Sequence, residues 1–176
     1  MILITFFLTL IVIVITILSC ISDVKSLRIP NWHSLVILAV FIPAWFLSPE
    51  SFTPLWQHAS AMAIMFAVSY IMFAFRIMGG GDSKLATVLG LWIGLQGLMP
   101  FILSMSIVGG LIGFISLIIR KKKPFKNPAK GSWVETAQAG GNSIPYGIAI
   151  AVGSWITILH TGFLLNQLDE VFRIIH

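Results

Sequence analysis

Residues 2–21 have the sequence ILITFFLTLIVIVITILSCI, twenty residues without a charged side chain. A helix needs about 20 predominantly apolar residues to cross the hydrocarbon core of a bilayer. Further apolar runs, separated by short polar segments, cover residues 32–47, 59–75, 85–98, 101–119 and 144–165. We therefore predict an all-α membrane protein with six transmembrane helices.

Composition supports one polytopic membrane domain over residues 1–176. The chain is 57% hydrophobic and only 10% charged, whereas soluble domains carry about 25% charged residues. The net charge of +5 does not indicate a nucleic-acid partner, because the basic residues lie between the apolar runs, where membrane topology requires them. The single cysteine, Cys20, excludes an intrachain disulfide or a zinc site built from several thiolates. The histidines show no ligand spacing, so no metal and no cofactor are predicted; they are His33, His58, His160 and His176.

Basic residues predict the orientation of the helices. They follow the first, third and fifth apolar runs, and ten of the eleven fall on one side of a six-helix topology: Lys25, Arg28, Arg76, Lys84, Arg120, Lys121, Lys122, Lys123, Lys126 and Lys130. Because cytoplasmic loops are enriched in lysine and arginine, this pattern predicts the N-terminus outside and a basic cytoplasmic loop over residues 120–143.

Two of the six acidic residues lie at the ends of apolar runs. Asp23 closes the first run and Asp82 opens the fourth, so the predicted topology brings both to the cytoplasmic boundary at a similar depth. Carboxylates at membrane depth are costly and usually functional. Two carboxylates sharing a proton can hydrolyse a peptide bond, the ionised one activating water while the neutral one polarises the carbonyl.

The surroundings of Asp82 favour this chemistry. Gly79, Gly80 and Gly81 precede it and allow a backbone to approach closely. A helix N-terminus at Asp82 would favour its ionised form, which predicts Asp82 as the base. A simpler alternative is that Asp23 pairs with Lys25 or Arg28, and Asp82 with Lys84, as ordinary interfacial charges. Lys84 itself could tune the pair or only extend to the membrane surface.

Three motifs in order carry a family resemblance. Asp23 is followed by Ile29-Pro30-Asn31, then by residues 79–85 (GGGDSKL), then by residues 144–147 (IPYG). This series resembles the signatures of type IV prepilin peptidases, which are GxGD-type intramembrane aspartyl proteases. The resemblance implies that Asp23 and Asp82 are catalytic, and that the glycines and Lys84 form an active-site loop. The substrate-positioning candidates are Pro30, Asn31, Pro145, Tyr146 and Gly147, although Pro30 and Asn31 also suit a plain helix start.

The same resemblance implies a substrate and a location. Such enzymes remove the leader of prepilins or pseudopilins, whose apolar helix stays in the membrane, at the cytoplasmic face of the inner membrane. Larger members carry a cytoplasmic insertion with cysteine pairs and also N-methylate the product. Asp23 follows the first run directly here, so N-methyltransferase activity is not expected. The compact form resembles the Tad/Cpa (Flp pilus) branch, with archaeal preflagellin peptidases as the alternative.

Two other classes of function remain open on the sequence alone. A proton- or cation-coupled transporter component could also use paired acids, but would place them near the midplane on broken helices. A non-catalytic pilus assembly protein would keep both acids in salt bridges. Replacing each aspartate with asparagine separates these classes, since only a peptidase would lose cleavage.

Overall fold

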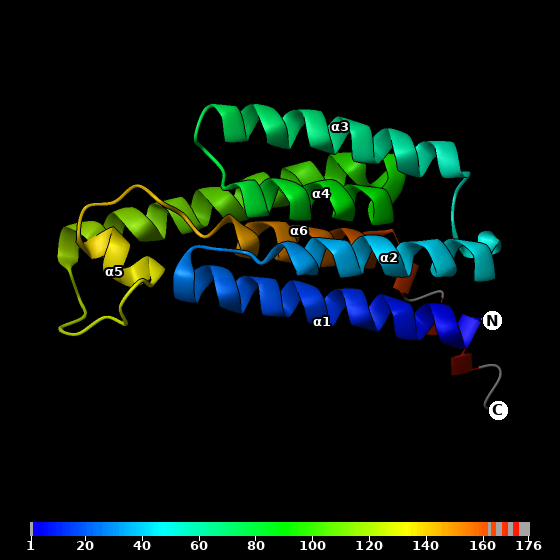
Figure 1. The fold of residues 1–176 in the computed structure, drawn as a ribbon, viewed down its shortest axis with the longest axis horizontal. Helices are drawn as coiled ribbons and strands as arrows, with labels where there is room; N and C mark the ends of the chain where they lie inside the picture. The colour runs from blue at the N-terminus through cyan, green and yellow to red at the C-terminus, as the bar shows by residue number, and fades with distance from the viewer. Residues whose placement is uncertain (1, 162, 165–166, 169–170, 173–176) are drawn as a thin grey trace.

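The structure is a computed structural model that describes residues 2–161, 163–164, 167–168 and 171–172. The regular elements of these residues are all helical, which confirms the predicted all-α class. In chain order they are α1 (Ile2–Ser26), α2 (Asn31–Leu47), the 3₁₀ helix η1 (Pro49–Ser51), α3 (Leu55–Ala74), α4 (Gly80–Lys122), α5 (Trp133–Gln138) and α6 (Tyr146–His160). All but the short η1 and α5 run side by side along the length of the molecule (Figure 1).

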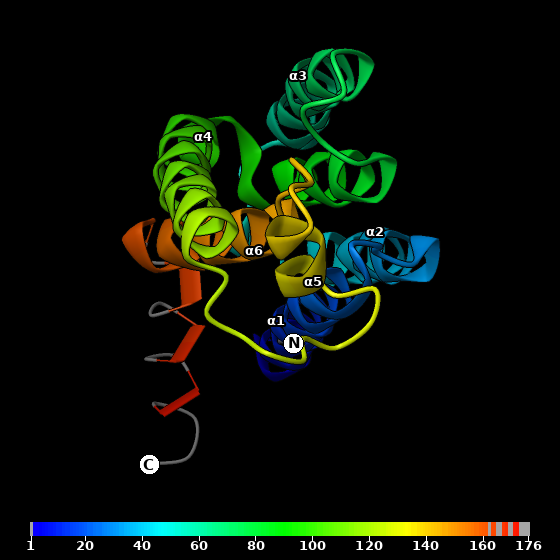
Figure 2. The same ribbon diagram turned by 90° about the vertical axis from the view of Figure 1, so that its left-hand side faces the viewer.

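Polar side chains connect neighbouring helices and show their directions. Ser19 hydrogen-bonds to His33 at 2.8 Å, and Thr5 hydrogen-bonds to Ser48 at 2.7 Å. The start of α1 therefore lies beside the end of α2, and the two helices are antiparallel. Seen end-on, α1 and α3 lie on opposite sides of the bundle, with α6 and the first half of α4 between them (Figure 2).

Helix α4 is two helices joined at a sharp reversal. Gly94 has φ 69° and ψ 178°, a backbone conformation that is essentially limited to glycine. The chain runs one way before Gly94 and back again after it (Figure 1). The apolar runs 85–98 and 101–119 predicted this break at Met99–Pro100, but Pro100 lies inside the second helix. The glycine makes the turn because the helix can reverse only through a conformation that residues with a Cβ rarely adopt.

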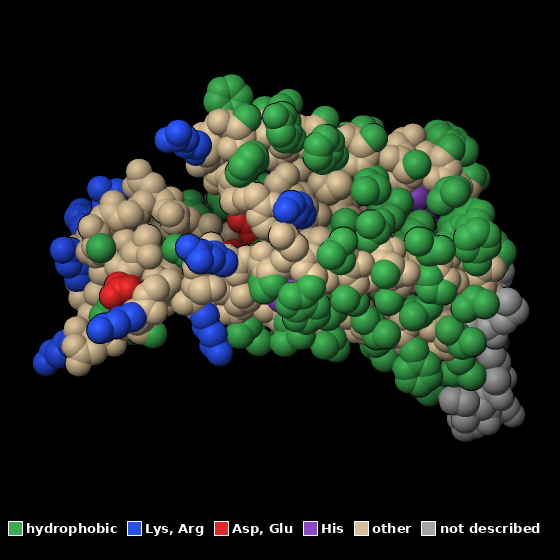
Figure 3. Space-filling view, viewed as in Figure 1, with side chains coloured by type: hydrophobic (Ala, Val, Ile, Leu, Met, Phe, Trp, Pro, Cys, Tyr) green, Lys and Arg blue, Asp and Glu red, His purple; other side chains and the backbone are tan. Residues whose placement is uncertain are grey.

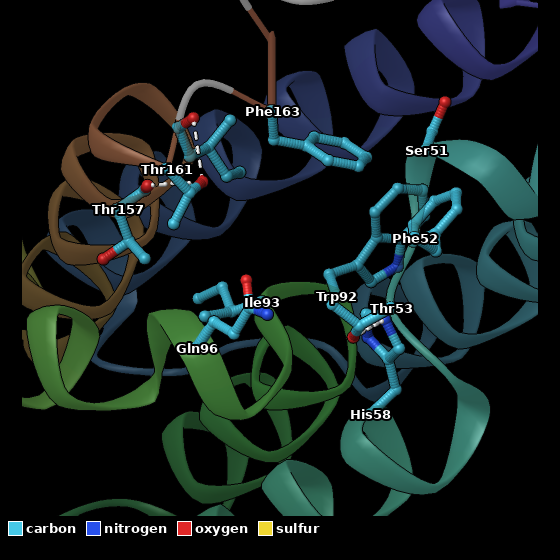
Figure 4. A pocket seen from close by; sticks show the side chains of 11 residues that line it. Ser51, Phe52, Thr53, His58, Trp92, Ile93, Gln96, Thr157, Thr161 and Phe163 are labelled. Carbon is cyan, nitrogen blue, oxygen red and sulfur yellow. Dashed lines mark hydrogen bonds between the residues drawn. The ribbon is translucent and has the colours of Figure 1, made fainter.

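His58 holds this reversal from the neighbouring helix α3. Its Nδ1 donates to the carbonyl of Leu91 at 2.7 Å, and its Nε2 contacts the hydroxyl of Thr53 at 2.9 Å. The last carbonyls of a helix lack helical partners, so the imidazole supplies one at the end of the first half of α4. Figure 4 shows His58 and Thr53 together on the wall of a cavity of about 140 Å³.

Within the described part of the chain, three helices are long and apolar enough to cross a membrane: Leu3–Ser26, Leu55–Ala74 and Gly80–Lys122. The shorter apolar helices are Asn31–Leu47 and Tyr146–His160. Several bounds differ from the predicted runs. Helix α1 continues past residue 21 to Ser26, and it stops where Leu27 takes a positive φ of 50°. Helix α6 covers less than residues 144–165, and residues 162 and 165 lie outside the described part of the chain.

Apolar and basic side chains occupy different parts of the surface. Large apolar side chains cover the body of the bundle, and lysine and arginine side chains gather at one end (Figure 3). This end holds the last residues of α1, the first residues of α4 and the segment around α5 (Figure 1). Several outward-facing apolar side chains are more than half exposed, as expected for contact with lipid: Phe7, Phe46, Phe66, Ile107 and Phe114.

Candidate active site

Asp23 lies near the end of α1 and is only 2% exposed. Its Oδ2 accepts a hydrogen bond of 2.7 Å from the backbone N–H of Gly147. Gly147 is in the first turn of α6, where backbone N–H groups lack partners inside the helix. A Cβ added to Gly147 would lie 2.9 Å from that oxygen and 3.1 Å from Cδ1 of Ile29. The approach of α6 to Asp23 therefore requires glycine.

Asp82 lies in the first turn of α4, as predicted, and is 7% exposed. Its Oδ2 accepts a hydrogen bond of 3.1 Å from the backbone N–H of Gly79, and its Oδ1 is buried without a hydrogen-bond partner. A Cβ on Gly81 would lie 2.8 Å from the backbone oxygen of Ile29. This confirms that the glycine segment permits a close backbone approach, here by the connection between α1 and α2.

The two carboxylates line one cavity of about 350 Å³ at the basic end of the bundle. Leu27 and Phe73 contribute apolar wall, while Arg76 and Asn142 contribute polar wall. Figure 3 shows acidic atoms at the floor of a hollow bordered by basic side chains. Asp23 and Asp82, nearly sixty positions apart in the sequence, thus line the same cavity, which is large enough for a peptide segment.

Helix N-termini act on both acids, not only on Asp82. Asp82 is held by the start of α4, and Asp23 is held by the start of α6 through Gly147. The positive end of a helix dipole stabilises a nearby carboxylate in either place. Stabilisation by a helix N-terminus therefore applies to both residues and does not distinguish Asp82 as the base.

Lys84 does not contact the aspartates. Its Nζ donates to Oδ1 of Asn31 at 2.9 Å, and both side chains are exposed. Pro30 precedes the first residue of α2, so the helix-start role predicted for Pro30 and Asn31 is confirmed. Lys84 and Asn31 border a groove beside the acidic cavity.

Of the predicted IPYG positions, only Gly147 hydrogen-bonds to an aspartate. Pro145 is buried at the start of α6. The ring of Tyr146 packs against Gly109 of α4; a Cβ added to Gly109 would lie 3.5 Å from this ring. These two residues position α6, and Gly147 carries the contact with Asp23.

Two contributors to the site have no recognisable signal in the sequence. Ile29 lies between Gly81 and Gly147 and therefore spaces α4 from α6. Asn142 lines the cavity and accepts a hydrogen bond of 2.9 Å from Arg120. Ile29 belongs to the Ile29-Pro30-Asn31 motif, but an isolated apolar side chain beside basic residues does not indicate a role in an active site. Asn142 lies in the predicted cytoplasmic loop over residues 120–143, just before the IPYG motif, and an asparagine in a basic loop gives no catalytic signal.

The fold and this cavity define a helical membrane protein with a buried pair of carboxylates. Residues 4–114, more than half of the chain, match the type IV leader peptidase family. The chain belongs to this family.

Three curated relatives are named prepilin leader peptidase/N-methyltransferase. The protein of Xanthomonas campestris pv. campestris is 37% identical over 79 residues, which is 45% of this chain and 22% of that protein. The protein of Pseudomonas aeruginosa is 35% identical over 82 residues, 47% of this chain and 23% of that protein. The protein of Aeromonas salmonicida is 31% identical over 105 residues, 56% of this chain and 31% of that protein. The alignments thus span less than a third of these relatives, and no solved structure is a significant match.

Proposed function

We propose that this chain is a prepilin leader peptidase, an intramembrane aspartyl endopeptidase whose catalytic pair is Asp23 and Asp82. The observation that carries the proposal is the shared cavity, in which both carboxylates are nearly buried and Oδ1 of Asp82 has no protein partner. An unpaired buried carboxylate oxygen is costly. Such an oxygen is available to a water molecule or to a substrate carbonyl.

Hydrolysis needs no group other than the two acids and water. The ionised carboxylate takes a proton from water while the oxygen of that water attacks the peptide carbonyl carbon. The neutral carboxyl group donates a hydrogen bond to the carbonyl oxygen, where negative charge develops. The C–N bond then breaks, and the leaving nitrogen takes up a proton from the pair. Because the two acids share the work, their titration belongs to the pair.

The proposed topology has six crossings, with the N-terminus outside and the cavity at the cytoplasmic face of the inner membrane. The reversal at Gly94 supports this count, since it converts α4 into two antiparallel segments. The gathering of lysine and arginine at the end that holds the aspartates supports the orientation. A basic leader would remain on that side, while the apolar part of the precursor would lie in the bilayer.

The proposed substrates are type IV or Flp-like prepilins and pseudopilins, and the proposed branch is the Tad/Cpa branch. We infer cleavage without N-methylation. Asp23 lies near the end of the first helix α1, and the chain has a single cysteine, so nothing in it corresponds to the cysteine-containing insertion of the larger members. Lys84 and Asn31 are proposed to shape the entrance to the site and not to take part in proton transfer, because they bond to each other.

The test is co-expression with a Flp-type prepilin in membranes, with leader removal followed by mass. The wild type should trim the precursor. Asp23→Asn and Asp82→Asn should each reduce the rate by at least about 10²–10⁴-fold, the usual contribution of a general acid or base. Glu135→Gln is the matched control, since Glu135 accepts from the backbone of Gly131 and not from a group in the cavity. Normal cleavage by both aspartate variants would reject the proposal.

A further inference from the structure

A groove lies beside the acidic cavity, between α2 and α3. Its volume is about 450 Å³, and its floor is the first half of α4. Most of its lining is apolar: Leu35 and Leu38 from α2, Met62 and Phe66 from α3, and Val88 from α4. The groove therefore suits an apolar segment that enters from the bilayer and not a water-soluble ligand.

Polar groups lie at one end of this apolar groove. Ser34 is only 6% exposed, yet its hydroxyl has no hydrogen-bond partner. Lys84 borders the same end. Within the described residues, its ammonium group has one hydrogen-bond partner, the neutral side-chain oxygen of Asn31. A buried hydroxyl without a partner is unfavourable. An occupant that supplies hydrogen-bond acceptors would satisfy both groups, whereas the hydrocarbon of a lipid tail would satisfy neither.

The polar end of the groove adjoins the catalytic cavity. Ser83, which lines the groove, follows Asp82 directly. On α3, Phe66 lines the groove and Phe73, two turns further along, lines the cavity. From Asp82 to Val88 the groove floor extends about 9 Å along the helix. A chain whose scissile bond lies at the aspartates would thus continue into the groove.

We propose that this groove holds the precursor segment that directly follows the scissile bond, with Ser34 and Lys84 donating to its backbone carbonyls. The inference rests on the proposed peptidase function. A cleavable bond must be extended, and extended backbone within a membrane needs partners for its polar groups. Ser34 and Lys84 supply them where the segment leaves the aspartates. The apolar side chains of Leu35, Leu38 and Phe66 then contact the part of the segment that stays in the bilayer.

Kinetics test the polar contact. Ser34→Ala should raise KM about fivefold, the effect of one net hydrogen bond, and leave kcat within twofold. The thermal midpoint of the enzyme should not fall, because the hydroxyl has no partner in the free protein. Ser106→Ala is the control, since Ser106 is exposed on the second half of α4 and bonds only to its own helix. An unchanged KM for Ser34→Ala would overturn the assignment of Ser34.

Photocrosslinking tests the occupant. Leu35 is replaced by p-benzoylphenylalanine in an Asp82→Asn background, so that uncleaved precursor accumulates, and Ile107 on the far half of α4 is replaced as the control. We expect precursor adducts from position 35 at least about tenfold above those from position 107. Lipid adducts alone at position 35, while the unmodified enzyme still cleaves, would overturn the groove assignment and leave the peptidase function standing. Failure of the unmodified enzyme to cleave would overturn both.

Discussion

Replacing Gly147 with alanine tests whether α6 positions the catalytic carboxylate of Asp23. The new methyl group would lie 2.9 Å from Oδ2 and 3.0 Å from Cβ of Asp23, and 3.1 Å from Cδ1 of Ile29. Cβ contacts under 3.0 Å force a displacement, and Asp23 belongs to the last turn of α1, whose backbone is held by the rest of that helix. The carboxylate must therefore rotate, or α6 must retreat by several tenths of an ångström.

Either response should reduce activity more than stability. A misplacement of about 1 Å can cost about 10²-fold in rate, and overpacking of this kind costs about 1–3 kcal/mol. We expect Gly147→Ala to cleave a prepilin roughly 10–100-fold more slowly, as measured by mass of the released product in membranes. Its thermal midpoint in detergent should fall by a few degrees.

Gly110→Ala is the matched control. Gly110 lies in α4, and a Cβ there meets nothing within 4 Å. Alanine in an open helical position is favoured over glycine by about 0.5–1 kcal/mol, so this variant should be fully active and no less stable. Full activity of Gly147→Ala with an unchanged thermal midpoint would refute the argument that close contact with α6 fixes Asp23.

Three further substitutions have defined outcomes. Gly94→Ala should lower the free energy of unfolding by about 1–3 kcal/mol, because its φ of 69° is strained for alanine; chemical denaturation in detergent measures this. His58→Ala should cost about 1–3 kcal/mol in the same assay by leaving a buried carbonyl without its donor, and His58→Asn should recover part of that loss. Gly81→Ala should reduce cleavage strongly, because its Cβ would lie 2.8 Å from the backbone oxygen of Ile29. Gly80→Ala should have only a mild effect on cleavage, because its Cβ would meet only the ring of Phe73, at 3.4 Å. Equal activity of the two glycine variants would contradict this account.

The helical class and the partnership of the two acids were accessible from sequence because each has a local signal. Long apolar runs predict helices wherever they occur. Asp23 and Asp82 stand out because charged residues are rare at the ends of such runs. Their predicted proximity follows from helix order alone, and the structure brings both to one cavity. Their catalytic role stays a prediction until cleavage is measured.

The contacts that determine the geometry lacked such signals. The bounds of the apolar runs placed the reversal of α4 at Met99–Pro100, but Gly94 makes the turn with His58 of α3 beside it. Whether a glycine inside an apolar run is a turn or a packing position depends on its neighbours in space. Ile29 and Gly147 likewise matter only because two distant helices meet there.

The spacing of the two acids depends on how closely the helix backbones approach, since the backbone at Gly81 meets the backbone of Ile29 and the backbone at Gly147 meets the side chains of Ile29 and Asp23. Side-chain rotamers can compensate for small errors at most enzyme sites, but a site in which glycine backbones lie directly against their neighbours has little such tolerance. Catalysis should therefore report on the docking of whole helices. In a series of increasingly harsh detergents, we expect cleavage to disappear while the far-ultraviolet circular dichroism still shows intact helices, so activity would be the earlier sign that the bundle has loosened.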